Sequence, residues 1–163
     1  MKKFTIAAAL AVLAAPAFAQ DLTPTIGDAA AGEEQFNRQC VACHIVADED
    51  GNVLAGRNAR TGPNQYGLIG SLIGTDPEFN YSDGLVALGE AGEVWNEENF
   101  VGYVQDPTGW IREKLEDRRA RGRMAYQVRA EADAYDLYAY LATFSDLDAA
   151  GDDADAEEAA PAD

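Results

Sequence analysis

A C-x-x-C-H motif limits the fold and the chemistry of this chain more than any other feature. It lies in the segment NRQCVACHIV, residues 37–46, and it contains both cysteines and the single histidine of all 163 residues, namely Cys40, Cys43 and His44. Such side chains at such a spacing serve as a disulfide or redox dithiol, as a zinc site, or as the attachment site of a covalent haem. Each of the three requires a different setting in the rest of the sequence.

The setting favours haem attachment. A disulfide within C-x-x-C closes a very short loop and stabilises little, and a thioredoxin-like dithiol needs a strand before its helix. A structural zinc site needs four protein ligands, and the acidic residues of the chain show no ligand spacing. Near the end of a helix, Cys40 and Cys43 would share one face and could each form a thioether with a haem vinyl group. His44 would then direct its imidazole toward the iron from the same side.

The two ends of the chain read as an export signal and a tail. Lys2 and Lys3, a short apolar stretch over 4–15 and the small residues around Phe18 are typical of a secretory signal peptide. We therefore expect residues 1–19 to be removed and the mature protein to be soluble in the periplasm, without a membrane span. Residues 146–163 contain eight acids and no base, which predicts a disordered acidic tail. Residues 20–145 remain as one domain.

The second axial ligand of the iron decides between electron transfer and catalysis. The mature chain has no other histidine, and its single methionine after loss of Met1 is Met124. A thioether sulfur stabilises ferrous iron and raises the reduction potential. An iron closed on both faces exchanges only electrons, which predicts a carrier that is not an enzyme. If Met124 instead fills the core, with Lys114 or nothing on the iron, the chain would be a haem c peroxidase or a gas-binding sensor.

Capping residues and apolar spacing predict an all-α fold. We expect helices over about 29–42, 82–91, 97–105, 108–117 and 131–144. No segment alternates as a strand should, and residues 45–75 have the composition of a loop. Loops of this length in a compact domain need something to organise them. The prediction is therefore three to five short helices and long loops around one covalently bound haem.

Charge is distributed unevenly along the chain. Its 12 bases and 29 acids leave a net charge of −17, which argues against nucleic acid as a partner. Yet residues 112–129 contain seven bases and three acids. A basic patch beside Met124 predicts docking onto an acidic surface of another protein. The alternative is a solvated surface whose arginines have no partner.

Five segments of the chain resemble the class I c-type cytochromes, and most of all the periplasmic cytochromes c2 of bacteria. They are GEEQFNRQCVACH, GRNARTGPNQYGLIG, WNEENFVGYVQDPTGWI, RARGRMAYQV and DLYAYLATF, which follow the order and spacing of the family over residues 26–145. The resemblance implies one haem c on Cys40 and Cys43, with His44 and Met124 as axial ligands. It also implies a monomeric carrier that takes electrons from the cytochrome bc1 complex. The acceptor would be a photosynthetic reaction centre, a terminal oxidase or denitrification reductases.

The resemblance assigns further roles. Pro63 would accept a hydrogen bond from the second ring nitrogen of His44, which orients the imidazole. Tyr81 and Trp95 would lie near a haem propionate and Tyr103 near the Met124 sulfur, although each aromatic could equally belong to the core. Gly32 and Phe36 of the first helix would cross Leu137 and Tyr140 of the last. The docking bases would be Arg60, Lys114, Arg118, Arg119, Arg121 and Arg123, mostly arginine where the family has lysine. Two further departures are Tyr126 in place of phenylalanine and Ser71 in place of arginine.

Overall fold

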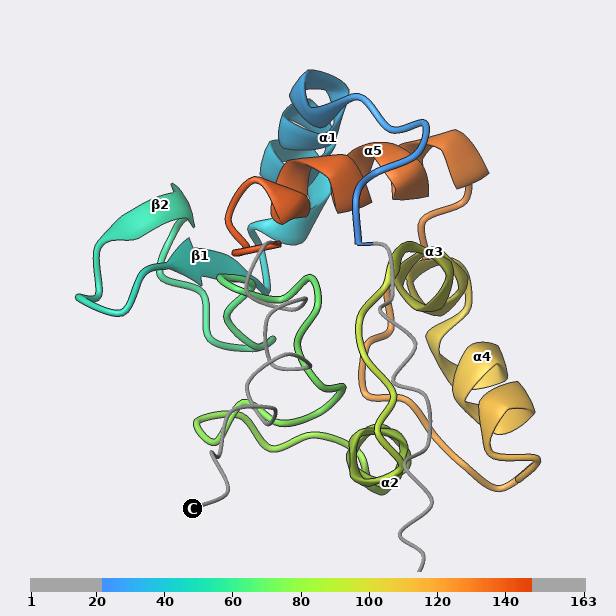
Figure 1. Ribbon diagram of the computed structural model, residues 1–163. Helices are drawn as coiled ribbons and strands as arrows, with labels where there is room; N and C mark the ends of the chain where they lie inside the picture. The colour runs from blue at the N-terminus through green and yellow to red at the C-terminus, as the bar shows by residue number, and fades with distance from the viewer. Residues whose placement is uncertain (1–21, 148–163) are drawn as a thin grey trace, which may run out of the picture.

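Helices and long loops make up nearly all of the computed structural model, which describes residues 22–147 (Figure 1). Its elements are α1 (Ala29–Gln35), the π-helical turn η1 (Phe36–Cys40), β1 (Ile45–Ala47), β2 (Val53–Gly56), α2 (Asp83–Glu90), α3 (Glu97–Gln105), α4 (Pro107–Lys114) and α5 (Glu131–Ala142). The predicted signal peptide over 1–19 lies outside the described residues, as does the predicted acidic tail beyond Leu147. Within residues 22–147, no helix combines the length and the apolarity that crossing a membrane requires.

Short polar side chains begin most of the helices. The Asp28 carboxylate accepts hydrogen bonds from the first backbone N–H groups of α1, and Ser82 and Asn96 do the same for α2 and α3. Asp106 both ends α3 and caps α4, where Pro107 occupies the first turn. Proline suits that position because its missing N–H would have no helical partner there. The five predicted helices are confirmed, and the ends of the last four agree with the prediction to within three residues.

The first predicted helix differs from expectation at its C-terminal end. Residues 29–42 were expected to form one regular helix, but α1 ends at Gln35 and a wider π turn runs on to Cys40. The N–H of Val41 bonds to the carbonyl of Phe36, five residues back, at 3.3 Å. The N–H groups of Cys43 and His44 then both bond to the Cys40 carbonyl, at 3.0 and 2.9 Å. The motif therefore forms a tight turn after the helix.

The expectation of no strand was wrong. Residues 45–47 and 53–56 pair as an antiparallel hairpin, with an irregular register between Val46 and Ala47. The hairpin lacks the alternation by which strands are recognised, because Ile45 and Val46 are both buried while Val53 and Leu54 are both exposed. In Figure 1 the hairpin projects from the body of the protein below α1.

The terminal helices cross and form much of the core (Figure 1). A Cβ on Gly32 would overlap the backbone oxygen of Asp136, so only glycine allows α1 to approach α5 this closely. Phe36 packs on Tyr140 with ring centroids 5.6 Å apart. The Tyr138 hydroxyl donates to the carbonyl of Leu22 at 2.7 Å, which fastens the start of the described chain to α5. The predicted crossing of the first and last helices is confirmed.

Candidate cofactor site

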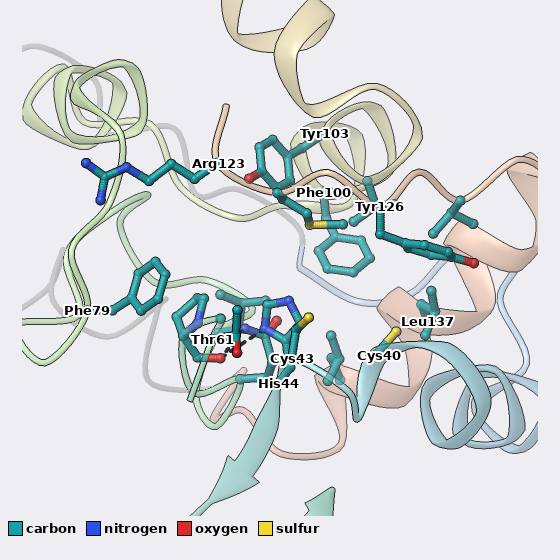
Figure 2. Close-up of a pocket in the computed structure, with 18 of the residues that line it drawn as sticks. Cys40, Cys43, His44, Thr61, Phe79, Phe100, Tyr103, Arg123, Tyr126 and Leu137 are labelled. Carbon is teal, nitrogen blue, oxygen red and sulfur yellow. Dashed lines mark hydrogen bonds between the residues drawn. The ribbon is translucent and has the colours of Figure 1, made fainter. Parts of the chain in front are cut away.

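A cavity of about 530 Å³ lies between the crossed terminal helices, α3 and the long loops. Its volume is in the range of small-molecule and cofactor sites. Most of its wall is apolar, and segments far apart in the sequence contribute to it (Figure 2). Apolar lining residues include Phe36, Leu68, Leu85, Phe100, Val104, Val128, Leu137 and Leu141.

The C-x-x-C-H motif lies along one wall of this cavity (Figure 2). Cys40 is half-buried, Cys43 is exposed, and both are free thiols. Burial, followed by the neighbouring Cys43, raises the pKa of Cys40 to about 11. Both thiols border the apolar cavity, where they are within the set of lining residues.

His44 is oriented by the segment that carries Gly62 and Pro63. Its Nδ1 lies 3.0 Å from the Pro63 carbonyl oxygen, the contact expected for this proline. Because a carbonyl only accepts, the proton is on Nδ1 and the lone pair of Nε2 is free to bind a metal. Burial lowers the pKa of His44, against the opposing effect of the Pro63 bond, so the ring is neutral at pH 7. A Cβ on Gly62 would overlap the ring, so glycine leaves room for the imidazole.

Three predicted aromatic residues also line the cavity. Trp95 and Tyr103 are buried with ring centroids 5.1 Å apart, and Trp95 stacks on Trp110 at 6.1 Å. Tyr81 is half-buried and meets Phe79 edge-on at 4.9 Å. Burial raises the pKa of Tyr103 to about 12, and burial followed by Asp76 raises that of Tyr81 to about 12. These phenols remain protonated hydrogen-bond donors over the physiological pH range.

The loop between α4 and α5 supplies the wall that faces the motif. Arg123, Met124 and Tyr126 of this loop line the cavity. In Figure 2, Arg123 and Tyr126 lie on the side of Tyr103, across the cavity from His44. Met124 is half-buried and packs against the apolar core. An imidazole and a thioether therefore border one apolar space from separate segments of the chain.

The predicted docking bases separate into two groups. Arg123 lines the cavity, whereas the others lie outside its wall. The Nζ of Lys114 is 5.6 Å from the centroid of the Trp110 ring on α4, and this lysine, considered above as an alternative iron ligand, is not part of the lining. The four remaining bases have exposed side chains; they are Arg60, Arg118, Arg119 and Arg121.

Several lining residues were missed by sequence reasoning. Phe79 and Phe100 are apolar residues in a loop and a helix, and nothing in a local pattern separates a cavity wall from an ordinary core. Gln39 and Thr61 flank predicted residues, and Gly62 precedes Pro63. The segment TGPN was the available signal for Thr61 and Gly62, since a proline expected to orient His44 brings its neighbours close to the ring.

The donor set suits haem and not a simple metal ion. Among residues 22–147, no three His, Cys, Asp or Glu side chains converge to hold a metal ion. A haem instead needs an apolar cavity for the macrocycle, thiols at its rim, and one or two axial ligands. Cys40, Cys43, His44 and Met124 supply these groups around the cavity. The residues present therefore fit a haem.

Comparison with known proteins agrees with this fit. No family model matches the chain. Cytochrome c2 of Rhodovulum adriaticum is 56% identical over 117 residues, 72% of this chain and 92% of that protein. Cytochrome c-551 of Roseobacter denitrificans is 44% identical over 143 residues, 86% of this chain and 95% of that protein. The crystal structure of cytochrome c2 from Rhodobacter sphaeroides has a TM-score of 0.71 and 44% identity, and covers 74% of this chain and 98% of its own.

The matches cover nearly the whole length of these relatives. Their sequence identities are well above the level at which two proteins share only a fold. The solved structure also shares the arrangement of short helices and long loops described above. The chain therefore belongs to the cytochrome c2 family of class I c-type cytochromes.

Proposed function

We propose that this protein is a periplasmic one-electron carrier whose haem c is attached to Cys40 and Cys43 and ligated by His44 and Met124. The observation that carries the proposal is an apolar cavity bordered by the imidazole and, from the α4–α5 loop, by the thioether. Its cytochrome c2 relatives support electron transport as the general role. The bound haem would supply a one-electron iron couple.

The chain's own residues would hold and tune that couple. The Pro63 carbonyl accepts from Nδ1 of His44 and so aims Nε2 into the cavity. The apolar walls exclude water, which strengthens electrostatic effects on the iron. The Trp95 indole and the Tyr81 phenol would donate hydrogen bonds to a propionate. With both axial positions filled, no site for a substrate would remain, and we infer that the protein is not an enzyme.

The partners are part of the proposal. The carrier would take electrons from the cytochrome bc1 complex. It would pass them to an acidic docking surface on a photosynthetic reaction centre, a terminal oxidase or a denitrification reductase. Its own docking surface would consist of six exposed bases, namely Arg60, Lys114, Arg118, Arg119, Arg121 and Arg123. Small, transient contacts between monomers and such partners suit rapid exchange.

Replacement of the methionine tests the proposal. Met124→Ala should abolish the sulfur-to-iron charge-transfer absorption of the oxidised haem protein and allow the reduced form to bind carbon monoxide. Tyr126→Phe, which changes another lining residue of the same loop, serves as the control and should do neither. Rapid binding of carbon monoxide by the reduced wild-type protein would contradict Met124 ligation. It would favour the peroxidase or gas-sensor alternative.

A further inference from the structure

Arg123 differs from the other bases of its segment in what its side chain contacts. It lines the cavity immediately before Met124, and its Nη1 donates a hydrogen bond to the backbone carbonyl of Asn80. Asn80 belongs to the loop before α2 that also carries Phe79 and Tyr81, two residues of the cavity wall. In Figure 2 the Arg123 guanidinium extends away from Tyr103, on the side of the cavity where Phe79 lies. Arg123 therefore joins two walls of the cavity.

The other hydrogen bonds of residues 121–129 in the described chain go to partners in or beside α3 and α4. Gly122 N–H bonds to the Thr108 hydroxyl at 3.1 Å, and Val128 N–H bonds to the Val104 carbonyl at 2.8 Å. The side chains of Arg121 and Gln127 bond to Ala120 and Asp106. These partners lie in α3, at Asp106 between α3 and α4, in α4, or in the chain that continues from α4. Among the hydrogen bonds recorded for residues 121–129, the bond from Arg123 alone reaches the loop over 76–82.

The Met124 segment is weakly held between these anchors. Residues 123–126 form no helix or strand, and Arg123, Ala125 and Tyr126 are exposed. Local opening is expected where a segment has little secondary structure and few buried contacts. A single bond across the cavity is therefore well placed to control how often Met124 leaves its position.

We propose that Arg123 is a latch, a positioning residue that fastens the Met124 loop to the Asn80 carbonyl and so keeps the thioether in the cavity. The latch rests on the proposed function, because it assumes that Met124 ligates the iron. It assigns to Arg123 a role distinct from the docking of partners. Arg121, two residues earlier, bonds only to the adjacent Ala120 carbonyl and has no such reach.

Competition by imidazole measures the latch directly. An external imidazole reaches the iron of the oxidised haem protein only when Met124 has moved away, so its apparent affinity scales with the open fraction of the loop. Loss of one hydrogen bond of ordinary net strength should raise that fraction about fivefold. Arg123→Ala should therefore bind imidazole about fivefold more tightly than the wild-type protein, and Arg123→Lys should lie between the two.

Three further variants distinguish loss of the Arg123 hydrogen bond from loss of its charge, from a role of the Asn80 side chain and from loss of Met124 itself. Arg121→Ala removes the same charge nearby, and Asn80→Ala keeps the accepting carbonyl, so both should bind imidazole as the wild type does. Met124→Ala should bind it far more tightly than any of them. Thermal unfolding of each variant, followed by haem absorbance, shows whether a change is local or global.

Two results would overturn the latch alone. In one, Met124→Ala binds imidazole tightly while Arg123→Ala matches the wild type. In the other, Arg121→Ala gains as much affinity as Arg123→Ala, which would make charge and not the bond responsible. If Met124→Ala binds imidazole no better than the wild type, methionine ligation itself is wrong and the latch fails with it.

Discussion

At the scale of single residues, His44 owes its orientation to a segment that follows it by 19 positions. The C-x-x-C-H motif is local, so the sequence alone suggested the thiols and the imidazole. The segment TGPN indicated only that Gly62 lies near the ring, whereas its steric role depends on how two loops meet in the folded chain. The glycine carries no chemistry, yet any larger residue would occupy the space of the ring.

Gly62→Ala should therefore destabilise the protein. A methyl group that overlaps the His44 ring must displace either the ring or the loop, and such overpacking costs about 1–3 kcal/mol in free energy of unfolding. Guanidinium unfolding followed by haem absorbance measures the loss. Thr61→Ala, which shortens the neighbouring exposed side chain, should have a much smaller effect. Equal stability of Gly62→Ala and the wild type would show that the imidazole is not confined here.

The Tyr81 phenol predicts a dependence of stability on alkaline pH. Its pKa is raised to about 12, by burial first and by Asp76 next, whereas a tyrosine in the unfolded chain has a pKa near 10. The unfolded state therefore releases this proton first, and the stabilisation present below pH 10 is lost as the pH rises toward 12. After allowance for solvent screening at a half-buried group, the loss is roughly 1–2 kcal/mol.

Tyr81→Phe should reduce this loss. The test compares the free energy of unfolding of the variant and the wild type at pH 9, 10, 11 and 12. The exposed Tyr66, changed to Phe, is the matched control and should leave the slope as it is. Identical slopes in Tyr81→Phe and the wild type would remove the phenol as its cause.

At the scale of elements, helices were more predictable than the segments between them. Three helix starts are predictable from N-capping side chains, those of Asp28, Ser82 and Asn96. The pair Asp106-Pro107 likewise predicts the boundary between α3 and α4. The hairpin and the π turn carry no comparable local signal. The first strand of the hairpin also bonds to a segment outside the hairpin, through the Gln65 N–H and the Ile45 carbonyl at 2.8 Å.

The crossing of α1 and α5 gives a prediction for Gly32→Ala. In an exposed helix, alanine would stabilise relative to glycine by up to about 1 kcal/mol. Here the added Cβ would overlap the backbone oxygen of Asp136, so we expect a net destabilisation of about 1–3 kcal/mol. Denaturant unfolding of the haem protein measures it, with exposed Glu33→Ala on the same helix as control. A more stable Gly32→Ala would mean that the helices are not in close contact at this position.

At the scale of the whole molecule, the cavity brings together residues from Phe36 to Leu141. The sequence could suggest its chemistry because the motif, the lone methionine and the spacing of conspicuous segments point to one cofactor. It could not assign most of the wall, since Phe100 or Leu68 looks the same whether it faces a cofactor or another side chain. Arg123 shows the same limit, because its charge suggested docking while its contact with Asn80 exists only in the folded chain.

The charge distribution of the chain predicts how the rate of electron transfer depends on salt concentration. The net charge of −17 repels an acidic partner, while the bases of residues 112–129 attract it over short range. Since the Debye length is about 8–10 Å at moderate salt, contacts at the docking surface should dominate. The second-order rate of electron transfer to an acidic acceptor should therefore fall as ionic strength rises. Stopped-flow mixing over a series of salt concentrations measures this dependence.

Reversing two of these charges should reverse the sign of the dependence of the electron-transfer rate on ionic strength. In an Arg118→Glu, Arg119→Glu double variant the local attraction is lost and the overall repulsion remains, so the rate at low salt should drop about tenfold or more. Added salt should then speed the reaction, because it screens repulsion. Arg57→Ala, at an exposed base outside residues 112–129, should keep the wild-type sign. A rate indifferent to salt in the wild type and in the double variant would mean that partners approach by another face, and that these arginines only interact with solvent.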